Sequence, residues 1–244
     1  MGITVAPVGK EPLYGKRLTL KAISSSHATF LKNCYNDDGF MNRYRLAQER
    51  TESIEEIQKR LEEIQNYSPL QLRHIEWVIE KRGSNSDGGD KLIGLASLAD
   101  YQPCHNRAEF LIGILDPNER NNSGIALEAA LLVLEFAFQK AHIHKVTTFI
   151  YAYNKEAQKN ILHLGFHQEA LLREHYFDSR SEKFIDLYQS GLLRSDFLSS
   201  DQLGRWSKRL LGRDITDEEG LNRGVKKVML NAELVSSIKK GLTG

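Results

Sequence analysis

Residues 115–126 read LDPNERNNSGIA, and this stretch joins a strand to a helix. The strand is predicted over residues 107–115 and ends at Asp116-Pro117-Asn118, because proline cannot donate to a β-ladder. The helix is predicted from Gly124 to about Ala141, and it is so apolar that it must be buried against a sheet. The unpaired N–H groups at its start, together with the helix dipole, suit an anion such as a pyrophosphate. An ordinary helix start is the alternative.

Downstream, β-branched and aromatic residues predict a strand over residues 145–153. Asn154 then begins a helix that stops at Gly165. Two more strands are predicted over residues 168–176 and 183–193, joined by a turn at residues 178–181. In this order the apolar helix is the crossover between two parallel strands.

Upstream, residues 17–23 alternate polar and apolar side chains and predict a strand. A helix is predicted over residues 27–35, a turn at Asn36-Asp37-Asp38-Gly39, and a second helix that opens at Thr51-Glu52-Ser53. Residues 74–80 and 92–98 then predict a hairpin. The whole pattern predicts an α/β (α+β) domain with a mixed central sheet of about seven strands, flanked by helices.

Three segments follow from this pattern. Residues 1–13 are predicted to be an irregular leader, residues 14–195 the α/β domain, and residues 196–244 a C-terminal helical extension. The extension is predicted from leucines that share one helical face between residues 203 and 211. It is either a cap on the domain or a surface for a partner.

The composition excludes several classes of protein. The 33 basic and 32 acidic residues leave a net charge of +1, which argues against nucleic-acid binding driven by bulk positive charge. No apolar run is long enough to span a bilayer, and no secretory signal is visible at the start. The two cysteines and eight histidines show no metal-ligand spacing, so no metal is predicted. We therefore expect a cytoplasmic protein without a membrane partner.

Four motifs, in this order and spacing, resemble the GNAT superfamily of N-acetyltransferases. Its pyrophosphate loop, Gln/Arg-x-x-Gly-x-Gly/Ala, is matched by NNSGIA at residues 121–126, with Asn121 in place of the leading Gln or Arg. Asn154 and the later Gly165-Phe166 match a second motif. The opening strand, GKRLTLK at residues 15–21, and the closing strand at residues 185–194 are similar to the RimJ/RimL-like branch of ribosomal-protein N-terminal acetyltransferases. The resemblance covers about residues 14–195 and implies the GNAT fold.

The resemblance implies an acetyl-CoA site and no metal. The strand before the loop would pair its backbone with the pantetheine arm, as an added strand does. The loop and first helical turn would hold the pyrophosphate, Asn154 would bond to the pantetheine or to the substrate, and Lys159 is either a phosphate ligand or a solvated lysine. The cofactor-binding prediction therefore comprises Ile112, Gly113, Ile114, Leu115, Asn121, Asn122, Ser123, Gly124, Ile125, Ala126, Asn154 and Lys159.

The implied reaction is direct attack of a neutral primary amine on the thioester, with a backbone N–H near Ile114 polarising the carbonyl. Glu109 is the predicted base or amine anchor, beside Asn154 as the second catalytic residue. An ordinary surface glutamate is the alternative for Glu109. Four further residues are candidates for binding the acceptor: His74, Glu76, His175 and Tyr176.

One departure from the family leaves the chemistry open. The tyrosine with which many GNAT enzymes protonate the leaving thiolate falls at Ile161. The main hypothesis is an acetyl-CoA-dependent N-acetyltransferase whose acceptor is a protein N-terminus or a small-molecule amine. The alternative is a weakly active or silent acyl-CoA-binding or protein-interaction module of the same fold. A homodimer is left open as a further partner.

Overall fold

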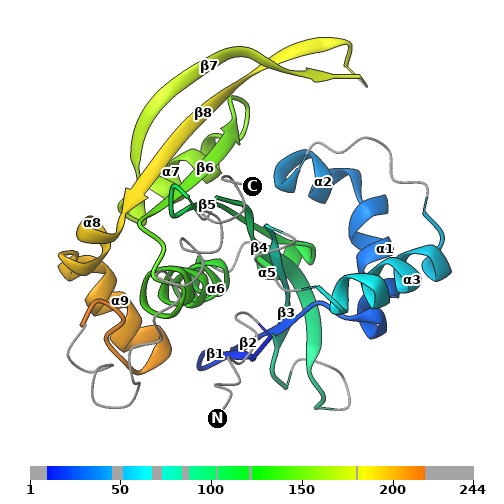
Figure 1. Cartoon of the computed structure of the whole chain (residues 1–244), viewed down its shortest axis with the longest axis horizontal. Coiled ribbons are helices and arrows are strands. Elements are labelled where there is room, and N and C mark those ends of the chain that lie inside the picture. Colours follow the sequence, from blue (N-terminus) through cyan, green and yellow to red (C-terminus); the bar gives the residue numbers. More distant parts are fainter. Residues whose placement is uncertain are drawn as a thin grey trace, which may run out of the picture.

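A single mixed sheet organises the chain in the computed structural model, which describes residues 10–45, 52–67, 73–83, 88–102, 104–120, 123–179 and 181–217. The sheet has eight strands in the order β1-β2-β3-β4-β5-β6-β8-β7 (Figure 1). The strands are β1 (Leu13–Tyr14), β2 (Leu18–Ala22), β3 (Ile75–Lys81), β4 (Lys91–Gln102), β5 (Arg107–Ile114), β6 (Lys145–Tyr151), β7 (His167–Asp178) and β8 (Lys183–Leu193). The seven predicted strands are confirmed, and β1 is an eighth that begins inside the predicted irregular leader.

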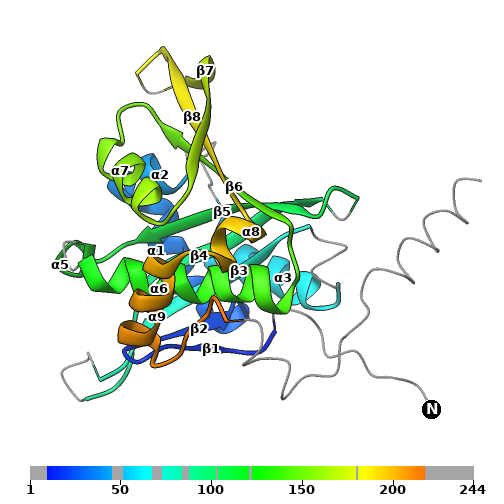
Figure 2. The same cartoon turned by 90° about the vertical axis from the view of Figure 1, so that its left-hand side faces the viewer.

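Helices cover both faces of the sheet (Figure 1, Figure 2). One face carries α1 (Ala28–Asn36), α2 (Asp38–Tyr44) and α3 (Ile54–Gln65), whose apolar side chains pack with Val78 and Leu95. The other carries α6 (Ser123–Glu135), its π-helical continuation η2 (Phe136–Lys140) and α7 (Lys155–His163). The short η1 (Ser25–His27) and α5 (Pro117–Arg120) lie before α1 and α6.

Helix α2 corrects one prediction. Asn36-Asp37-Asp38-Gly39 was predicted to be a turn, yet a new helix begins at Asp38. The Asp37 side chain accepts a hydrogen bond from the amide of Phe40 at 2.6 Å, so the turn-forming residue acts as an N-cap. Phe40 and Met41 are then buried against the sheet, which stabilises a helix of only seven residues.

Helix α6 is the centre of the larger core, as its composition predicts. Its residues from Ala129 to Leu134 are fully or almost fully buried. β5 and β6, which it joins, pair in parallel, so the predicted crossover is confirmed. The short α8 (Arg194–Leu198) follows β8 and leads into α9 (Asp201–Leu211). On the side of α6 away from the sheet, α9 packs against α6 through its side chains Leu203 and Leu211. The start of the predicted C-terminal extension therefore belongs to the same core, and residues 218–244 lie outside the described residues.

Two electrostatic contacts tie the ends of the described chain to α6. Glu128 accepts hydrogen bonds from Arg17, and Glu135 pairs with Arg213 through two contacts of 2.7 and 2.5 Å. Further along, the Gln139 side chain donates to the carbonyl of Ile215 at 2.9 Å. Among the helices of the described ranges, none is long and apolar enough to cross a membrane.

Candidate active site

The strands β5 and β6 separate after a short stretch of pairing. Their register comprises three pairs, of which Glu109 with Thr147 is the last. From Phe110 to Ile114, β5 continues to pair with β4 on its other side but has no partner position on β6. The backbone groups that face the divergence are therefore available to an extended ligand, which can pair as an added strand does. The predicted Ile112, Gly113 and Ile114 all lie on this segment.

Leu115 differs from its neighbours. Its amide donates to the Ile93 carbonyl at 2.7 Å, and its carbonyl accepts from the Arg120 guanidinium at 3.2 Å. The same guanidinium donates to the Ile114 carbonyl, also at 3.2 Å. The amide and carbonyl of Leu115 and the carbonyl of Ile114 are thus already paired within the chain.

Two ion pairs brace the loop after β5. Lys91 lies 2.6 Å from Asp116, and Lys81 lies 2.5 Å from Glu119. Both lysines belong to strands of the central sheet, so α5 is held close to the sheet edge.

The start of α6 lies beside a positive charge from Arg17, a residue distant in the sequence that precedes β2. Ser123, Gly124, Ile125 and Ala126 form its first turn, whereas Asn121 and Asn122 lie outside the described residues. A Cβ at Gly124 would lie 2.6 Å from Nη2 of Arg17, so the glycine makes room for a guanidinium as well as for any phosphate oxygen. That Nη2 atom is buried and has no hydrogen-bond partner among the described residues. A helix N-terminus with an adjoining guanidinium suits a diphosphate.

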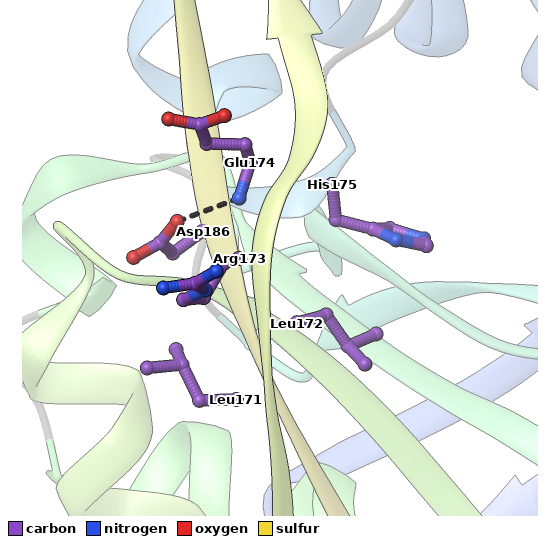
Figure 3. Close-up of a pocket in the computed structure, with 6 residues that line it drawn as sticks. All are labelled: Leu171, Leu172, Arg173, Glu174, His175 and Asp186. Atoms are coloured by element: carbon purple, nitrogen blue, oxygen red, sulfur yellow. Dashed lines mark hydrogen bonds between the residues drawn. The ribbon is translucent and has the colours of Figure 1, made fainter.

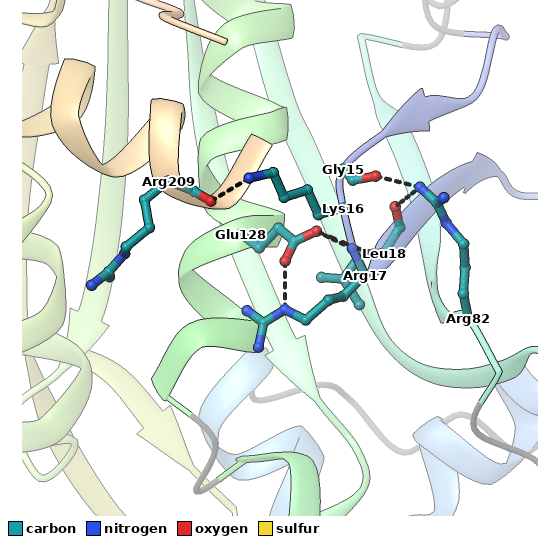
Figure 4. A network of polar contacts seen from close by, with 7 residues as sticks. All are labelled: Gly15, Lys16, Arg17, Leu18, Arg82, Glu128 and Arg209. Atoms are coloured by element: carbon teal, nitrogen blue, oxygen red, sulfur yellow. Dashed lines mark hydrogen bonds and ion pairs between the residues drawn. The ribbon is translucent and has the colours of Figure 1, made fainter. Parts of the chain in front are cut away.

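Glu128 holds this guanidinium in place (Figure 4). Its fully buried carboxylate accepts from the Arg17 amide at 2.7 Å, from Arg17 Nε at 2.8 Å and from the Leu18 amide at 3.2 Å. Since two of these donors are backbone amides, the contact also fixes where β2 begins beside α6. Sequence reasoning missed Arg17 because its partner is 111 residues away.

Helix α7 contributes fewer free groups than its motif suggests. The Asn154 side chain accepts from the Ala157 amide at 3.3 Å and so acts as the N-cap of α7, which leaves its NH2 group to reach a ligand. Lys159 is exposed on the helix surface. Ile161, at the position of the family's tyrosine, is buried in the core with Leu164 and Phe166.

Carboxylates gather on the sheet face that α1 and α2 cover. Glu76 is opposite Ser97 across β3 and β4, and Glu109 is opposite Ala99 across β4 and β5, so both project from the same face. His74 Nε2 lies 3.8 Å from Glu76 Oε2. Burial raises the pKa of Glu109 above its usual value, and the charges of Arg45 and His74 oppose this shift in part. The structure thus places three predicted residues on one side of the β5–β6 divergence.

The remaining two predicted acceptor residues lie on β7, at an irregularity. Leu172 pairs with Leu187 and Tyr176 with Ile185, so Asp186 alone faces three residues of β7. The Glu174 amide donates to Asp186 Oδ1 at 2.7 Å, and Glu174 has a φ of 50°. Figure 3 shows His175 on the same side of β7 as Leu172 and away from Asp186.

This bulge borders a hollow and an aromatic cluster. The hollow has a volume of about 610 Å³ and is lined by Leu171, Leu172, Arg173, Glu174, His175 and Asp186. The Tyr176 ring packs edge-on against Tyr151 of β6, with centroids 5.9 Å apart. Tyr151 also stacks on Tyr153, whose hydroxyl donates to the Asn42 carbonyl of α2. α2 is therefore joined to the end of β6, so α2 and the β6–β7 aromatics lie on the same side of the sheet.

Metal ligation finds no support in the described ranges, where no three His, Cys, Asp or Glu side chains are grouped to hold an ion. Both cysteines are free, Cys34 buried and Cys104 exposed. The polar groups that the structure does bring together are two carboxylates, an imidazole and several phenols beside an opened sheet.

A model of the acetyltransferase (GNAT) domain matches residues 17–167. The chain belongs to the GNAT acetyltransferase family. It is thus an N-acetyltransferase that uses acetyl-CoA, and its eight-stranded mixed α/β sheet is the GNAT fold. The predicted fold and enzyme class are confirmed, and the match does not extend to the RimJ/RimL-like branch.

Relatives support the same family. An uncharacterized N-acetyltransferase of Bacillus subtilis, YoaA, is 25% identical over 174 residues, which is 70% of this chain and 92% of that protein. Spermidine N(1)-acetyltransferase of Vibrio cholerae is 28% identical over 186 residues, which is 76% of this chain and 98% of that protein. A crystal structure of spermidine N-acetyltransferase from Vibrio cholerae, in complex with CoA and spermine, matches with a TM-score of 0.63 and 25% identity. It covers 75% of this chain and 99% of that one.

Proposed function

We propose that this GNAT enzyme acetylates a primary amine where β5 and β6 diverge, by direct attack on the thioester of acetyl-CoA. The observation that supports the site is the loss of pairing after Glu109 and Thr147, which leaves residues 110–114 without a partner strand on one edge. Ile112, Gly113 and Ile114 would pair with the pantetheine arm. The first turn of α6 and Arg17 would hold the diphosphate.

Glu109 is the proposed base, because it stands at the last paired position before the strands diverge. Its carboxylate takes a proton from the acceptor ammonium, and the lone pair of the neutral amine attacks the carbonyl carbon. The nitrogen then gives its second proton to water, the carbon–sulfur bond breaks, and coenzyme A leaves as a thiolate, since Ile161 offers no proton. The raised pKa of Glu109 strengthens it as a proton acceptor at neutral pH. Asn154 would orient the pantetheine through its free NH2 group.

The acceptor we favour is a small amine with more than one positive charge. Glu76 and Glu109 project from one sheet face and give two anionic points for such a molecule. Relatives point the same way, because three of them carry the name spermidine N(1)-acetyltransferase, one from Vibrio cholerae and two from strains of Escherichia coli. His175 and Tyr176 on β7 would form the opposite wall. A protein N-terminus, the acceptor expected of the RimJ/RimL-like branch, carries a single α-amino charge at this point.

Thiol release tests the proposal directly. Free coenzyme A would be followed with a thiol reagent, using acetyl-CoA and, in turn, spermidine, butylamine and a peptide with a free N-terminus. We expect turnover with spermidine, and loss of at least about 100-fold in kcat/KM for Glu109→Gln. The matched control is Glu63→Gln, an exposed glutamate of α3. Turnover with the peptide alone would overturn the acceptor class, and unchanged activity of the Glu109 variant would overturn its role as base.

Self-association and the cytoplasm stay predictions for this chain. A dodecameric structure is known for spermidine N-acetyltransferase from Vibrio cholerae, and it matches this chain with a TM-score of 0.59. We propose that this chain also associates with copies of itself. Light scattering after gel filtration would measure the assembly, and a monomer at micromolar concentration would contradict the proposal.

A further inference from the structure

Tyr44, the last residue of α2, reaches across two strands of the sheet. Its ring stacks on Phe40 with centroids 5.1 Å apart and an interplanar angle of 26°. Its hydroxyl lies 3.2 Å from Oε1 of Glu76 on β3 and 3.2 Å from Oγ of Ser97 on β4. The side chain thus connects α2 to β3 and to β4, the latter being the neighbour of β5 in the sheet.

Gly113 makes this reach feasible. A Cβ at Gly113 would lie 2.9 Å from Cδ2 of Tyr44 and 2.6 Å from Cε2 of Phe40. Any larger residue at position 113 would collide with both rings where they stand. The glycine next to the predicted thioester-binding position therefore serves the acceptor face as well as the cofactor strand.

The direction of the hydrogen bonds follows from chemistry. A carboxylate can only accept, so the single proton of the Tyr44 hydroxyl goes to Glu76, and Ser97 donates to the phenol oxygen in turn. Burial, followed by the nearby charge of Glu76, raises the pKa of Tyr44 well above its usual 10, so the phenol keeps its proton. Glu76 is held in one orientation by Tyr44 while its other oxygen faces His74.

We infer that Tyr44 is a positioning residue, which aims Glu76 at a second positive charge of an acceptor whose reacting amine lies at Glu109. This inference rests on the proposed function of the same site. Glu76 and Glu109 are two strands apart and displaced by two residues along the strands, since Ser97 and Ala99 are their partners on β4. Regular sheet spacings give about 12 Å between their Cα atoms, and the two side chains can narrow this distance. Such a pair fits an extended diamine or polyamine and offers a monoamine only one of its two contacts.

The test compares two acceptors of different charge. The chain saturated with coenzyme A would be titrated with spermidine and, separately, with butylamine in a calorimeter. Tyr44→Phe keeps the ring and its stacking but removes the proton donor. We expect it to weaken spermidine binding roughly tenfold and to change butylamine binding by less than about twofold. The matched control is Tyr67→Phe, because Tyr67 is an exposed residue beyond the end of α3.

A double-mutant cycle separates positioning from a general structural effect. Glu76→Gln should weaken spermidine binding by a similar factor, and the double variant with Tyr44→Phe should lose little more. The affinity for coenzyme A should stay within about twofold in each variant, whereas disruption of the sheet would weaken it. Equal losses for both amines, or additive losses in the double variant, would overturn the inference.

The proposed function fails separately. If the unmodified chain binds spermidine more tightly than the Tyr44→Phe variant does but releases no thiol, the catalytic proposal is wrong and the positioning role stands. If the unmodified chain binds no spermidine yet acetylates butylamine, the inference on Tyr44 is wrong and the catalytic proposal stands.

Discussion

Replacing Glu128 by alanine should destabilise the fold more than any exposed glutamate does. The substitution removes a fully buried carboxylate that accepts from two backbone amides and from the Arg17 guanidinium. Each buried amide left without an acceptor costs about 1–3 kcal/mol, and loss of the ion pair adds less than it would for a fully buried pair, because the Arg17 side chain is 40% exposed. We therefore expect the free energy of unfolding to fall by about 4 kcal/mol.

Glutamine at the same position gives a graded comparison. Glu128→Gln keeps the shape and one acceptor oxygen for the amides, but it turns an NH2 group toward a donor and removes the charge. A loss of about 2 kcal/mol follows, intermediate between the native residue and alanine. Both variants would be unfolded in urea and followed by circular dichroism, beside Glu63→Ala, an exposed control expected to change stability by less than about 0.5 kcal/mol. If Glu128→Ala loses no more than this control, the buried contact does not hold α6 to β2.

Three further substitutions test the site itself. Gly113→Ala should weaken binding of both coenzyme A and the acceptor, because its Cβ would meet Phe40 and Tyr44 at under 3.0 Å; calorimetry with each ligand measures this. Ile161→Tyr should lower the melting temperature through a loss of about 1–3 kcal/mol and leave kcat no higher, since the larger ring overpacks a buried position. The raised pKa of Glu109 predicts that kcat/KM rises with pH through that pKa and that Glu109→Gln removes the rise. Ionised Glu109 should also lower the free energy of unfolding relative to the Glu109→Gln variant. This loss should be absent below the usual pKa of a glutamate and should grow as the pH rises from there to the raised pKa. Urea unfolding of both proteins at several pH values measures it, and a difference that does not change with pH would contradict the prediction.

Local pattern was enough to predict the layers of the fold. Alternation predicts the strands over residues 17–23 and 107–115, and an unbroken apolar helix between two strands requires a parallel crossover. These signals depend only on neighbours in the sequence, so one amino-acid sequence is enough to predict the strands and the crossover. α2 escaped the same reasoning because Asp37 is typical of a turn and of an N-cap alike, and only burial of Phe40 decides between them.

The candidate site depends more on contacts distant in the sequence. Glu109 was predicted from its place before the cofactor strand, and in the structure it forms the last pair before β5 and β6 separate. Tyr44 and Arg17 could not be predicted, because their partners Glu76 and Glu128 lie 32 and 111 residues away and no local period connects them. The catalytic and binding roles of all these residues stay predictions until the experiments above are done.

The ion pair between Glu135 of α6 and Arg213 has a consequence for synthesis on the ribosome. Arg213 follows Glu135 by 78 residues, so the pair can form only after these residues have been synthesised. At ordinary translation speeds this interval is on the order of 4–16 seconds. During that time the outer side of the central helix, later covered by Leu203 and Leu211 of α9, faces water. The nascent polypeptide therefore exposes an apolar surface of α6 until α9 has emerged from the ribosome, and a chaperone that binds nascent chains can bind this surface.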